Sequence, residues 1–368
     1  MKFRSPALPR GFVHRHQENS RMINVGIVGI GFMGMIHYLA YKQVRGAKVS
    51  AVVSRERRKL AGDWRGIQGN FGPPGTQMDL RGVAGYLDWR QLLDDPSIDL
   101  VDICLPPDLH AEVAIAALAA GKHVLCEKPI ALTLADATRM VRAAEKARRQ
   151  LLIGHVLPFM PEYAFAYEAI RGGKYGKLLG GYFKRVISDP LWIKDFYDPR
   201  KVGGPVVDLH IHDAHFIRLV SGMPAAVFST GRMRGDAVEF VDTQFLYPGK
   251  RLAVAATSGV IAQQGRSFTH AFEIYLEQAT LVYDSAVLGG EAVTGTPLTL
   301  LGSDGRVRRP KLKAVDAFAL ELREAVRSAS ENRPSPLLSG ALARDALALC
   351  LAETASVKTG RPVKLSKK

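Results

Sequence analysis

The chain has 368 residues and a formal net charge of +15 at pH 7. Its length suggests two domains, and 47% hydrophobic with 23% charged residues is typical of a globular protein. No run of residues is apolar for long enough to form a membrane-spanning helix, so a membrane protein is excluded. Cys104, Cys126 and Cys350 are widely separated. They predict neither a disulfide framework nor a metal motif, which fits a reducing cytoplasm.

The basic residues are scattered and are not interleaved with aromatic residues, so we expect no nucleic-acid partner. Residues 1–21 form a basic leader that lacks the apolar segment of a signal peptide.

A dinucleotide fingerprint follows this leader. Residues 25–28 are apolar and predict a buried parallel strand, and residues 35–41 predict a helix. Between them lies a turn with Gly29, Gly31 and Gly34 in G-x-G-x-x-G spacing. The first glycine suits a tight turn, the second a close approach to a pyrophosphate, and the third close helix–strand packing. A glycine-rich turn without a ligand is the alternative, but a strand before and a helix after it favour the dinucleotide site.

The next strand, residues 48–53, ends where many NAD-binding proteins place an acidic residue against the ribose. Here Ser54 and Arg55 follow the strand. A small hydroxyl followed by a cation suits a 2′-phosphate, so we expect NADP in preference to NAD. The alternative interpretation is an exposed basic helix start.

Further strands and helices alternate up to residue 153. Residues 61–85 predict a loop, 98–105 a strand, 109–120 a helix capped by Asp108 and ended by Gly121, 122–126 a strand, and 134–149 a helix after Thr133. Glu127 and Lys128 follow the strand that ends at residue 126. Polar residues in that position lie where open α/β sheets bind ligands. We therefore predict a doubly wound Rossmann domain over residues 22–153.

The pattern changes after this point. Residues 181–187, 225–233, 238–245, 252–261 and 268–283 predict strands separated by turns. We expect a second, α+β domain over residues 154–368, built on a large, open and mostly antiparallel sheet.

A cluster of ionisable residues lies in this second domain. Pro205 suits the first turn of a helix, on which Asp208, His212 and His215 would share one face. A carboxylate and two imidazoles so arranged could be a proton relay, a metal site or a hydrogen-bonded structural cluster, and the spacing does not separate the three. His210 would point elsewhere and is interpreted as structural.

These motifs together resemble the glucose–fructose oxidoreductase/inositol dehydrogenase/rhizopine-catabolism (GFO/IDH/MocA) family. The resemblance rests on the fingerprint, the strand ending at Pro106 with His110 after it, and Gly121-Lys122-His123-Val124 running into Glu127-Lys128-Pro129. It continues through Gly154-His155, Pro161 and Gly203-Gly204-Pro205-Val206-Val207-Asp208-Leu209-His210-Ile211-His212, and through closing helices at residues 314–330 and 338–358.

The resemblance implies catalytic roles for Lys128, Asp208 and His212. It implies substrate contacts from these three residues, His155 and His215. The implied cofactor-binding residues are Gly29, Gly31, Phe32, Met33, Gly34, Ser54, Arg55, Leu105, Pro106, His110, Glu127 and Lys128. It also implies a homodimer or homotetramer formed through the second-domain sheet.

The chain departs from the family pattern at Leu105, Pro107, Pro158, Pro205 and His215. These differences leave the fold and cofactor expectations unchanged but leave the substrate unassigned.

We therefore expect a cytoplasmic NAD(P)-dependent dehydrogenase that acts on a secondary alcohol of a sugar, cyclitol or related polyol and requires no metal. His212 would accept the hydroxyl proton, Asp208 would orient His212, and Lys128 would polarise the developing carbonyl. A cofactor-assisted glycoside lyase or hydrolase, and a non-catalytic nucleotide-binding regulator, are the alternatives.

Overall fold

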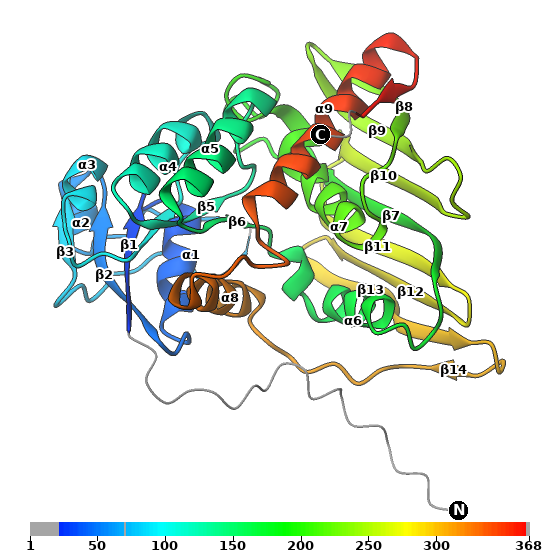
Figure 1. Ribbon diagram of the computed structural model, residues 1–368, viewed down its shortest axis with the longest axis horizontal. Coiled ribbons are helices and arrows are strands. Elements are labelled where there is room, and N and C mark those ends of the chain that lie inside the picture. Colours follow the sequence, from blue (N-terminus) through cyan, green and yellow to red (C-terminus); the bar gives the residue numbers. More distant parts are fainter. Residues whose placement is uncertain (1–21, 70, 366–368) are drawn as a thin grey trace, which may run out of the picture.

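The computed structural model describes residues 22–69 and 71–365; the predicted leader, residues 1–21, lies outside this part of the chain. Two sheets lie side by side, with helices packed on each (Figure 1). The first has six parallel strands in the order β3-β2-β1-β4-β5-β6. They are β1 (Ile23–Val28), β2 (Ala47–Val53), β3 (Ala84–Tyr86), β4 (Leu100–Ile103), β5 (His123–Glu127) and β6 (Leu151–Gly154).

This strand order confirms the predicted doubly wound Rossmann sheet. The order reverses beside β1, and such sheets bind ligands at the carboxyl ends of their strands at that reversal. The associated helices are α1 (Phe32–Tyr41), α2 (Arg57–Leu60), α3 (Trp89–Leu93), α4 (His110–Ala119) and α5 (Leu134–Ala147).

Two predicted helix caps have different outcomes. Thr133 caps α5, because its side chain accepts the backbone N–H of Asp136. The predicted cap by Asp108 is wrong. A short 3₁₀ turn, η2 (Pro107–Leu109), precedes α4, and no side chain caps either element. The fixed φ of Pro107 suits the first position of such a turn, which makes Asp108 part of the turn instead of a residue outside it.

The second sheet has nine strands in the order β14-β13-β12-β11-β7-β10-β9-β8-β15. Among the described strands of this second sheet, only β7 and β10 pair in parallel. The strands are β7 (Leu178–Ser188), β8 (Ala226–Arg234), β9 (Ala237–Leu246), β10 (Ala253–Ile261), β11 (Arg266–Leu276), β12 (Ala279–Leu288), β13 (Glu291–Gly302), β14 (Val307–Arg308) and β15 (Val363–Lys364). The predicted large, mostly antiparallel sheet is confirmed.

One predicted strand is in fact a hairpin. Residues 268–283 were expected to form a single strand, but the chain turns at Glu277 and Gln278 and divides them between β11 and β12. No Gly, Pro, Asn or Asp marks this turn, so the usual turn signal is absent from the sequence.

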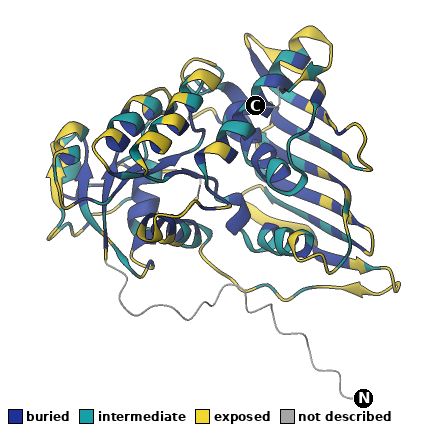
Figure 2. Ribbon diagram, viewed as in Figure 1, coloured by how far each residue is buried: buried dark blue, intermediate teal, exposed yellow. Residues whose placement is uncertain are grey.

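Helices cover one face of the second sheet and leave the other open (Figures 1 and 2). The covering elements are η3 (Leu157–Phe159), α6 (Pro161–Arg171), the π-helical turn η4 (Val206–His210), α7 (Ile211–Ser221) and α9 (Gly340–Thr359). The remaining described helix, α8 (Ala317–Glu331), does not cover this sheet. It packs against α1, which belongs to the Rossmann half. None of the helices described is both long and apolar enough to cross a membrane.

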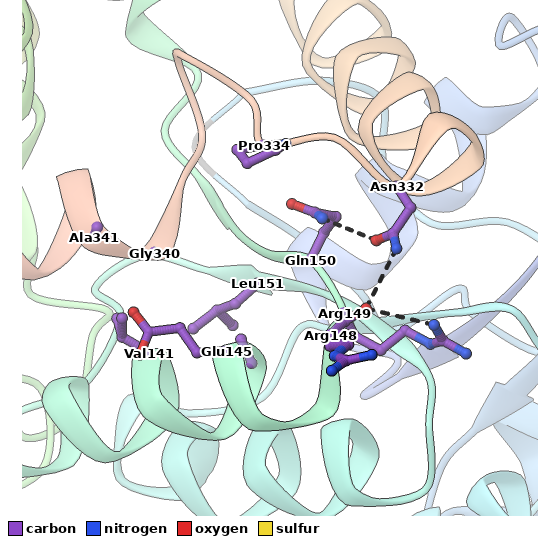
Figure 3. Close-up of a pocket in the computed structure, with 11 residues that line it drawn as sticks. Val141, Glu145, Arg148, Arg149, Gln150, Leu151, Asn332, Pro334, Gly340 and Ala341 are labelled. Carbon is purple, nitrogen blue, oxygen red and sulfur yellow. Dashed lines mark hydrogen bonds between the residues drawn. The ribbon is translucent and has the colours of Figure 1, made fainter.

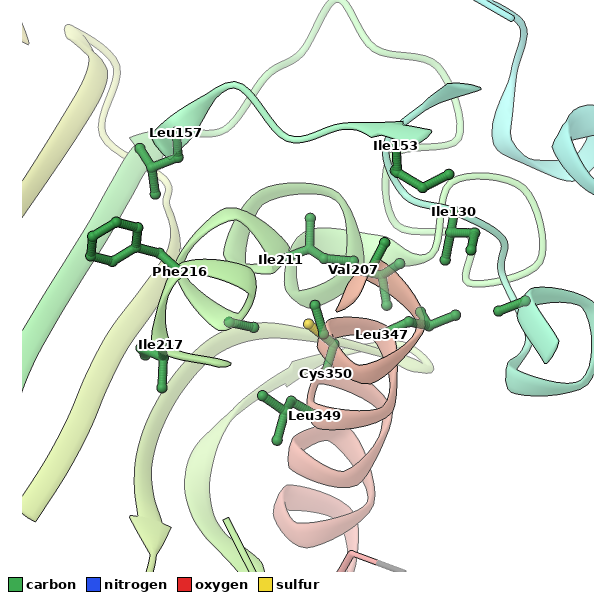
Figure 4. Packing of buried hydrophobic residues seen from close by; sticks show 14 of the residues in the cluster. Ile130, Ile153, Leu157, Val207, Ile211, Phe216, Ile217, Leu347, Leu349 and Cys350 are labelled. Atoms are coloured by element: carbon green, nitrogen blue, oxygen red, sulfur yellow. The ribbon is translucent and has the colours of Figure 1, made fainter. Parts of the chain in front are cut away.

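A continuous hydrophobic core joins the two halves (Figure 4). Ile130 follows β5, Ile153 lies in β6, Val207 in η4, Ile211 in α7 and Leu347 in α9, and all five are buried in one cluster. Ile130, Val207 and Ile211 lie one or two residues from Lys128, Asp208 and His212. The same packing that joins the two halves therefore holds these polar residues in place.

Candidate active site

The glycine turn has the shape that a dinucleotide requires. Gly29 has φ +101°, and a Cβ there would lie 2.6 Å from the carbonyl oxygen of Cys104. A Cβ on Gly34 would lie 2.1 Å from the oxygen of Gly29. A Cβ on Gly31 would meet nothing within 4 Å. Two glycines therefore permit close packing, and the middle one faces the open space that a pyrophosphate would fill.

The N-terminus of α1 lies against this space. Gly31 is its N-cap residue and no side chain caps it. The first N–H groups of a helix have no partners within the helix and attract anions. Phe32 and Met33, both partly buried, form this first turn. The residues present thus fit a bound dinucleotide phosphate.

The tip of β2 carries the predicted cofactor-selecting residues. Ser54 is nearly buried, and its hydroxyl accepts the backbone N–H of Glu56 at 3.2 Å. Arg55 is exposed and makes no ion pair with the described residues. Glu56 pairs with Arg58 and Lys59, each at 2.7 Å. The one nearby acid is therefore engaged by cations, while the guanidinium of Arg55 is available.

The loops after β4 and β5 are joined by His110. Its Nδ1 lies 2.8 Å from the oxygen of Pro129 and its Nε2 lies 2.9 Å from the oxygen of Leu105. The ring is fully buried, and that burial lowers its pKa. Both ring nitrogens thus have main-chain partners, and the contact between His110 and the cofactor stays a prediction. The residue instead fixes the two loops, of which Leu105 packs against Gly29 and Pro106 is exposed.

Lys128 and Asp208 meet between the two halves. Lys128 Nζ donates to Asp208 Oδ1 at 3.0 Å and to the main-chain oxygen of Asp208 at 2.7 Å. Neither side chain is fully buried, with 19% and 26% of their surfaces exposed. An ion pair at the carboxyl end of β5, open to solvent on one side, can receive a small polar ligand.

The prediction of a regular helix through Asp208, His212 and His215 is wrong for its first turn. Residues 206–210 form a π turn before α7 begins at Ile211. A π turn holds more residues than an α turn. The side chains of Asp208, His212 and His215 therefore no longer lie on one face of a regular helix. Asp208 consequently contacts Lys128, and the expected orientation of His212 by Asp208 is replaced by this pairing.

His212 is partly buried beside this pair. Burial and, next, the charge of Lys128 hold its pKa well below the usual range for histidine. It is therefore neutral at physiological pH, as a proton acceptor must be. The next residue, Asp213, forms a buried ion pair with Arg185 of β7, and this pair anchors the first turn of α7 to the second sheet.

His155 and His215 lie behind His212. Their rings stack with centroids 3.9 Å apart, and the ring of His155 meets that of His212 edge-on at 6.3 Å. Both are fully buried, and their contact with substrate stays a prediction. Burial lowers the pKa of His215 to about 3 and that of His155 well below its usual range. His210 is buried and pairs with Glu353 at 3.1 Å, as its structural interpretation predicted.

A buried group of ionisable residues near the end of β5 was missed. It comprises the buried His37, Asp102, Glu127 and Glu321 with the partly buried Cys104, and only Glu127 had been assigned a role. One signal was available in the sequence. Asp102 lies in the middle of an apolar strand, where a carboxylate requires a partner.

A cavity of about 360 Å³ lies away from these residues (Figure 3). It is formed by the end of α5, the start of β6 and the segment between α8 and α9, including Arg148, Arg149, Leu151 and Asn332. Because it lies at the amino end of β6, it is at the opposite edge of the sheet from Lys128.

The glycine turn and the paired Lys128 and Asp208 beside neutral His212 fit an oxidoreductase that uses a nicotinamide dinucleotide. Family comparisons agree. Residues 23–155 match the oxidoreductase family with an NAD-binding Rossmann fold, and residues 163–282 match the GFO/IDH/MocA C-terminal domain. The chain is 30% identical over 287 residues to 1,5-anhydro-D-fructose reductase from Ensifer adhaerens, across 75% of this chain and 82% of that protein. The chain belongs to the GFO/IDH/MocA family of oxidoreductases.

Two other comparisons extend over nearly the whole chain. It is 27% identical over 359 residues to myo-inositol 2-dehydrogenase from Thermotoga maritima, across 93% of this chain and 98% of that protein. The structure of a levoglucosan dehydrogenase in complex with NADH and levoglucosan superposes with a TM-score of 0.75. That structure is 22% identical, covers 94% of this chain and all of its own, and shows a shared fold.

Proposed function

We propose that this protein is an NADP-preferring dehydrogenase that acts on a secondary alcohol of a sugar, cyclitol or related polyol. The observation that carries the proposal is the contact between Lys128 and Asp208 across the two halves, beside a neutral His212. The names of the relatives support the substrate class, since they are an anhydrofructose reductase, an inositol dehydrogenase and a levoglucosan dehydrogenase.

In this proposal the nicotinamide, when bound, exchanges the hydride, and the chain handles the proton and the charge. His212 accepts the proton of the substrate hydroxyl, because its ring is neutral. Lys128 donates a hydrogen bond to the same oxygen and stabilises the negative charge that develops there. Asp208 orients Lys128 through the carboxylate and the main-chain oxygen that both accept from its Nζ.

The preference for NADP rests on the tip of β2. The guanidinium of Arg55, which makes no ion pair with the described residues, and the hydroxyl of Ser54 suit a 2′-phosphate. Glu56 is held by Arg58 and Lys59. We further propose a cytoplasmic enzyme that works without a metal ion and forms a homodimer or homotetramer through the open face of the second sheet.

A substrate screen with a lysine variant tests the central proposal. Levoglucosan, myo-inositol, 1,5-anhydro-D-fructose and D-glucose are incubated with reduced or oxidised cofactor, and absorbance of the reduced nicotinamide is followed. Lys128→Met should keep cofactor affinity and lose turnover by about 10²–10⁴-fold, which is typical for a group that acts on the reacting oxygen. Its melting temperature serves as the control for folding.

Other outcomes would assign a different function. Sugar breakdown without net cofactor turnover would indicate the lyase or hydrolase, and cofactor binding without either reaction would indicate a regulator. A stable Lys128→Met protein with normal turnover would refute the proposed mechanism.

A further inference from the structure

The buried ionisable group lies next to Lys128 and comes from four elements. His37 belongs to α1, Asp102 to β4, Glu127 to the end of β5 and Glu321 to α8, and Cys104 follows β4. His37, Asp102 and Glu321 have no exposed surface, and Glu127 has very little. Charges at this depth are stable only when they are paired, so their arrangement has energetic consequences.

His37 joins two of the carboxylates. Its Nδ1 is hydrogen-bonded to Asp102 Oδ2 at 2.9 Å. Its Nε2 lies 3.0 Å from Glu127 Oε1, an ion-pair contact whose angle departs from that of a hydrogen bond. Since both nitrogens face carboxylate oxygens, a ring that carries N–H on each nitrogen presents a positive charge to both carboxylates. Burial alone would lower the pKa of His37, but the nearby Asp102 raises it well above its usual value.

Glu127 transmits this contact to the main chain of Lys128. Its second oxygen, Oε2, accepts the backbone N–H of Lys128 at 3.2 Å. Gly154 faces the same carboxylate, and a Cβ there would lie 3.0 Å from Glu127 Oε1. A side chain at position 154 would therefore displace the Glu127 carboxylate, whereas glycine leaves room for that carboxylate. The resulting series of contacts runs from Asp102 through His37 and Glu127 to the backbone of Lys128.

The other ionisable groups around His37 complete its surroundings. On α1, burial and, next, the nearby Asp102 raise the pKa of the Tyr41 phenol well above its usual value. Cys104 Sγ lies 3.6 Å from both His37 Nδ1 and Asp102 Oδ1. From α8, Glu321 has two carboxyl oxygens without a hydrogen-bond partner, and burial, followed by Glu127, raises its pKa well above its usual value. Burial raises the pKa of Cys126 as well. The raised pKa values favour the neutral forms of Tyr41, Glu321 and Cys126.

We propose that His37 is a positioning residue for Lys128, which it places by fixing the carboxylate of Glu127 against the Lys128 backbone N–H. The inference rests on the proposed catalytic role of Lys128, but the position of its main chain can be tested without turnover. The proposed role is indirect, because His37 has no exposed surface and contacts the carboxylates of Asp102 and Glu127.

Amide hydrogen exchange measures this positioning directly. His37→Gln cannot carry the charge that pairs with both carboxylates, so Glu127 should loosen and the Lys128 amide should exchange about tenfold faster, or more. Amides inside β5, such as those of Val124 and Leu125, should keep their protection. His270→Gln is the matched control, because His270 is also a buried histidine but lies on β11. It should leave the Lys128 amide unchanged.

Kinetics on the best substrate of the screen provide a second readout. His37→Gln should lower kcat by about tenfold with little change in KM, because the lysine is misplaced in an otherwise intact site. Added to Lys128→Met, the same change should cost almost nothing further, because the residue through which it acts is already absent. If His37→Gln does not fold, Glu127→Gln replaces it, since it breaks the same series of contacts one residue later.

Several results would overturn the inference. They are unchanged exchange at Lys128 in a folded His37→Gln protein, loss of protection throughout β5, or a full additional loss of kcat in the Lys128→Met background. Stoichiometric zinc released by His37→Gln would instead make His37, Asp102 and Cys104 a metal site. Normal turnover of Lys128→Met would refute the proposed function, while altered exchange at Lys128 would still establish the effect of His37 on its backbone.

Discussion

Asp208 fixes the direction of the Lys128 side chain through two hydrogen bonds. Asp208 supplies both a carboxylate oxygen and a main-chain oxygen, so the ammonium can turn only within the space between them. Its third N–H remains for a ligand. The long side chain thus loses its conformational entropy when the protein folds, and it loses little more when substrate binds.

The pH at which activity falls on the acid side of the pH–rate profile, its acid limb, should depend on the charge of Lys128. His212 must be neutral to accept a proton, so activity falls as pH drops through its pKa. That pKa is low because of burial and the Lys128 charge. Lys128→Met removes the second cause, so the limb of its residual kcat/KM should move to higher pH. In Asp208→Asn the positive charge remains, and the limb should not move upward. A downward shift in Lys128→Met would contradict the assignment of His212 as the base.

Metal removal should leave activity unchanged. The charge on the substrate oxygen is stabilised by Lys128 in the proposed mechanism, so no Lewis acid is needed. Dialysis against a chelator, followed by elemental analysis and assay, tests this. Activity that is lost on dialysis and restored by zinc would show that the prediction is wrong.

Single elements differ in how far sequence could predict them. The fingerprint was predictable because strand, glycine turn and helix are consecutive, and Gly29, Gly31 and Gly34 each have a local steric reason. The π turn at residues 206–210 was not, because Pro205 equally suits an α-helix and only packing of Val206 and Val207 in the core selects the wider turn. The group around His37 brings together residues up to 284 positions apart, from 37 to 321. No local pattern contains such contacts.

Cofactor preference is a property of one strand end. Ser54→Asp would place a carboxylate beside the 2′-phosphate and provide an acceptor for ribose hydroxyls, so NADPH should bind at least about tenfold more weakly, or about 1.4 kcal/mol, and NADH more tightly. Fluorescence titration with both cofactors measures the change. Arg55→Ala should also weaken NADPH binding, because it removes the cation that suits the 2′-phosphate. Arg139→Ala, which removes an exposed arginine from α5, is its charge-matched control. The interpretation fails if the unmodified protein binds NADH tenfold better than NADPH.

At the scale of the whole molecule, the open face of the second sheet carries apolar and aromatic side chains in register. Phe228, Gln244, Ala255, Tyr182 and Glu273 lie in one row across five strands. A neighbouring row contains, in order, Gly180, Tyr275, Thr280 and Leu301. A broad, partly apolar surface of this kind is typical of an interface between subunits.

Charge placed on this face should separate the subunits. Tyr182→Lys with Tyr275→Lys would bury like charges in a symmetric interface, so light scattering after size exclusion should show a smaller species than the unmodified protein. Leu191→Lys is the control, because Leu191 is 75% exposed on the loop after β7 and lies outside the sheet. A monomeric unmodified protein, or an unchanged double variant, would contradict the proposed assembly.

The packing of α8 on α1 also has a consequence for the order in which the protein can fold during synthesis. Leu322, Ala325 and Val326 of α8 complete a core with Ile27 and Met35, which are among the first described residues to leave the ribosome. The part of α1 that packs on α8 therefore has no permanent partner until the chain has been made to beyond residue 326. Until then the nascent Rossmann half exposes a surface that chaperones recognise, and a chain that stops after the second sheet leaves that surface exposed permanently.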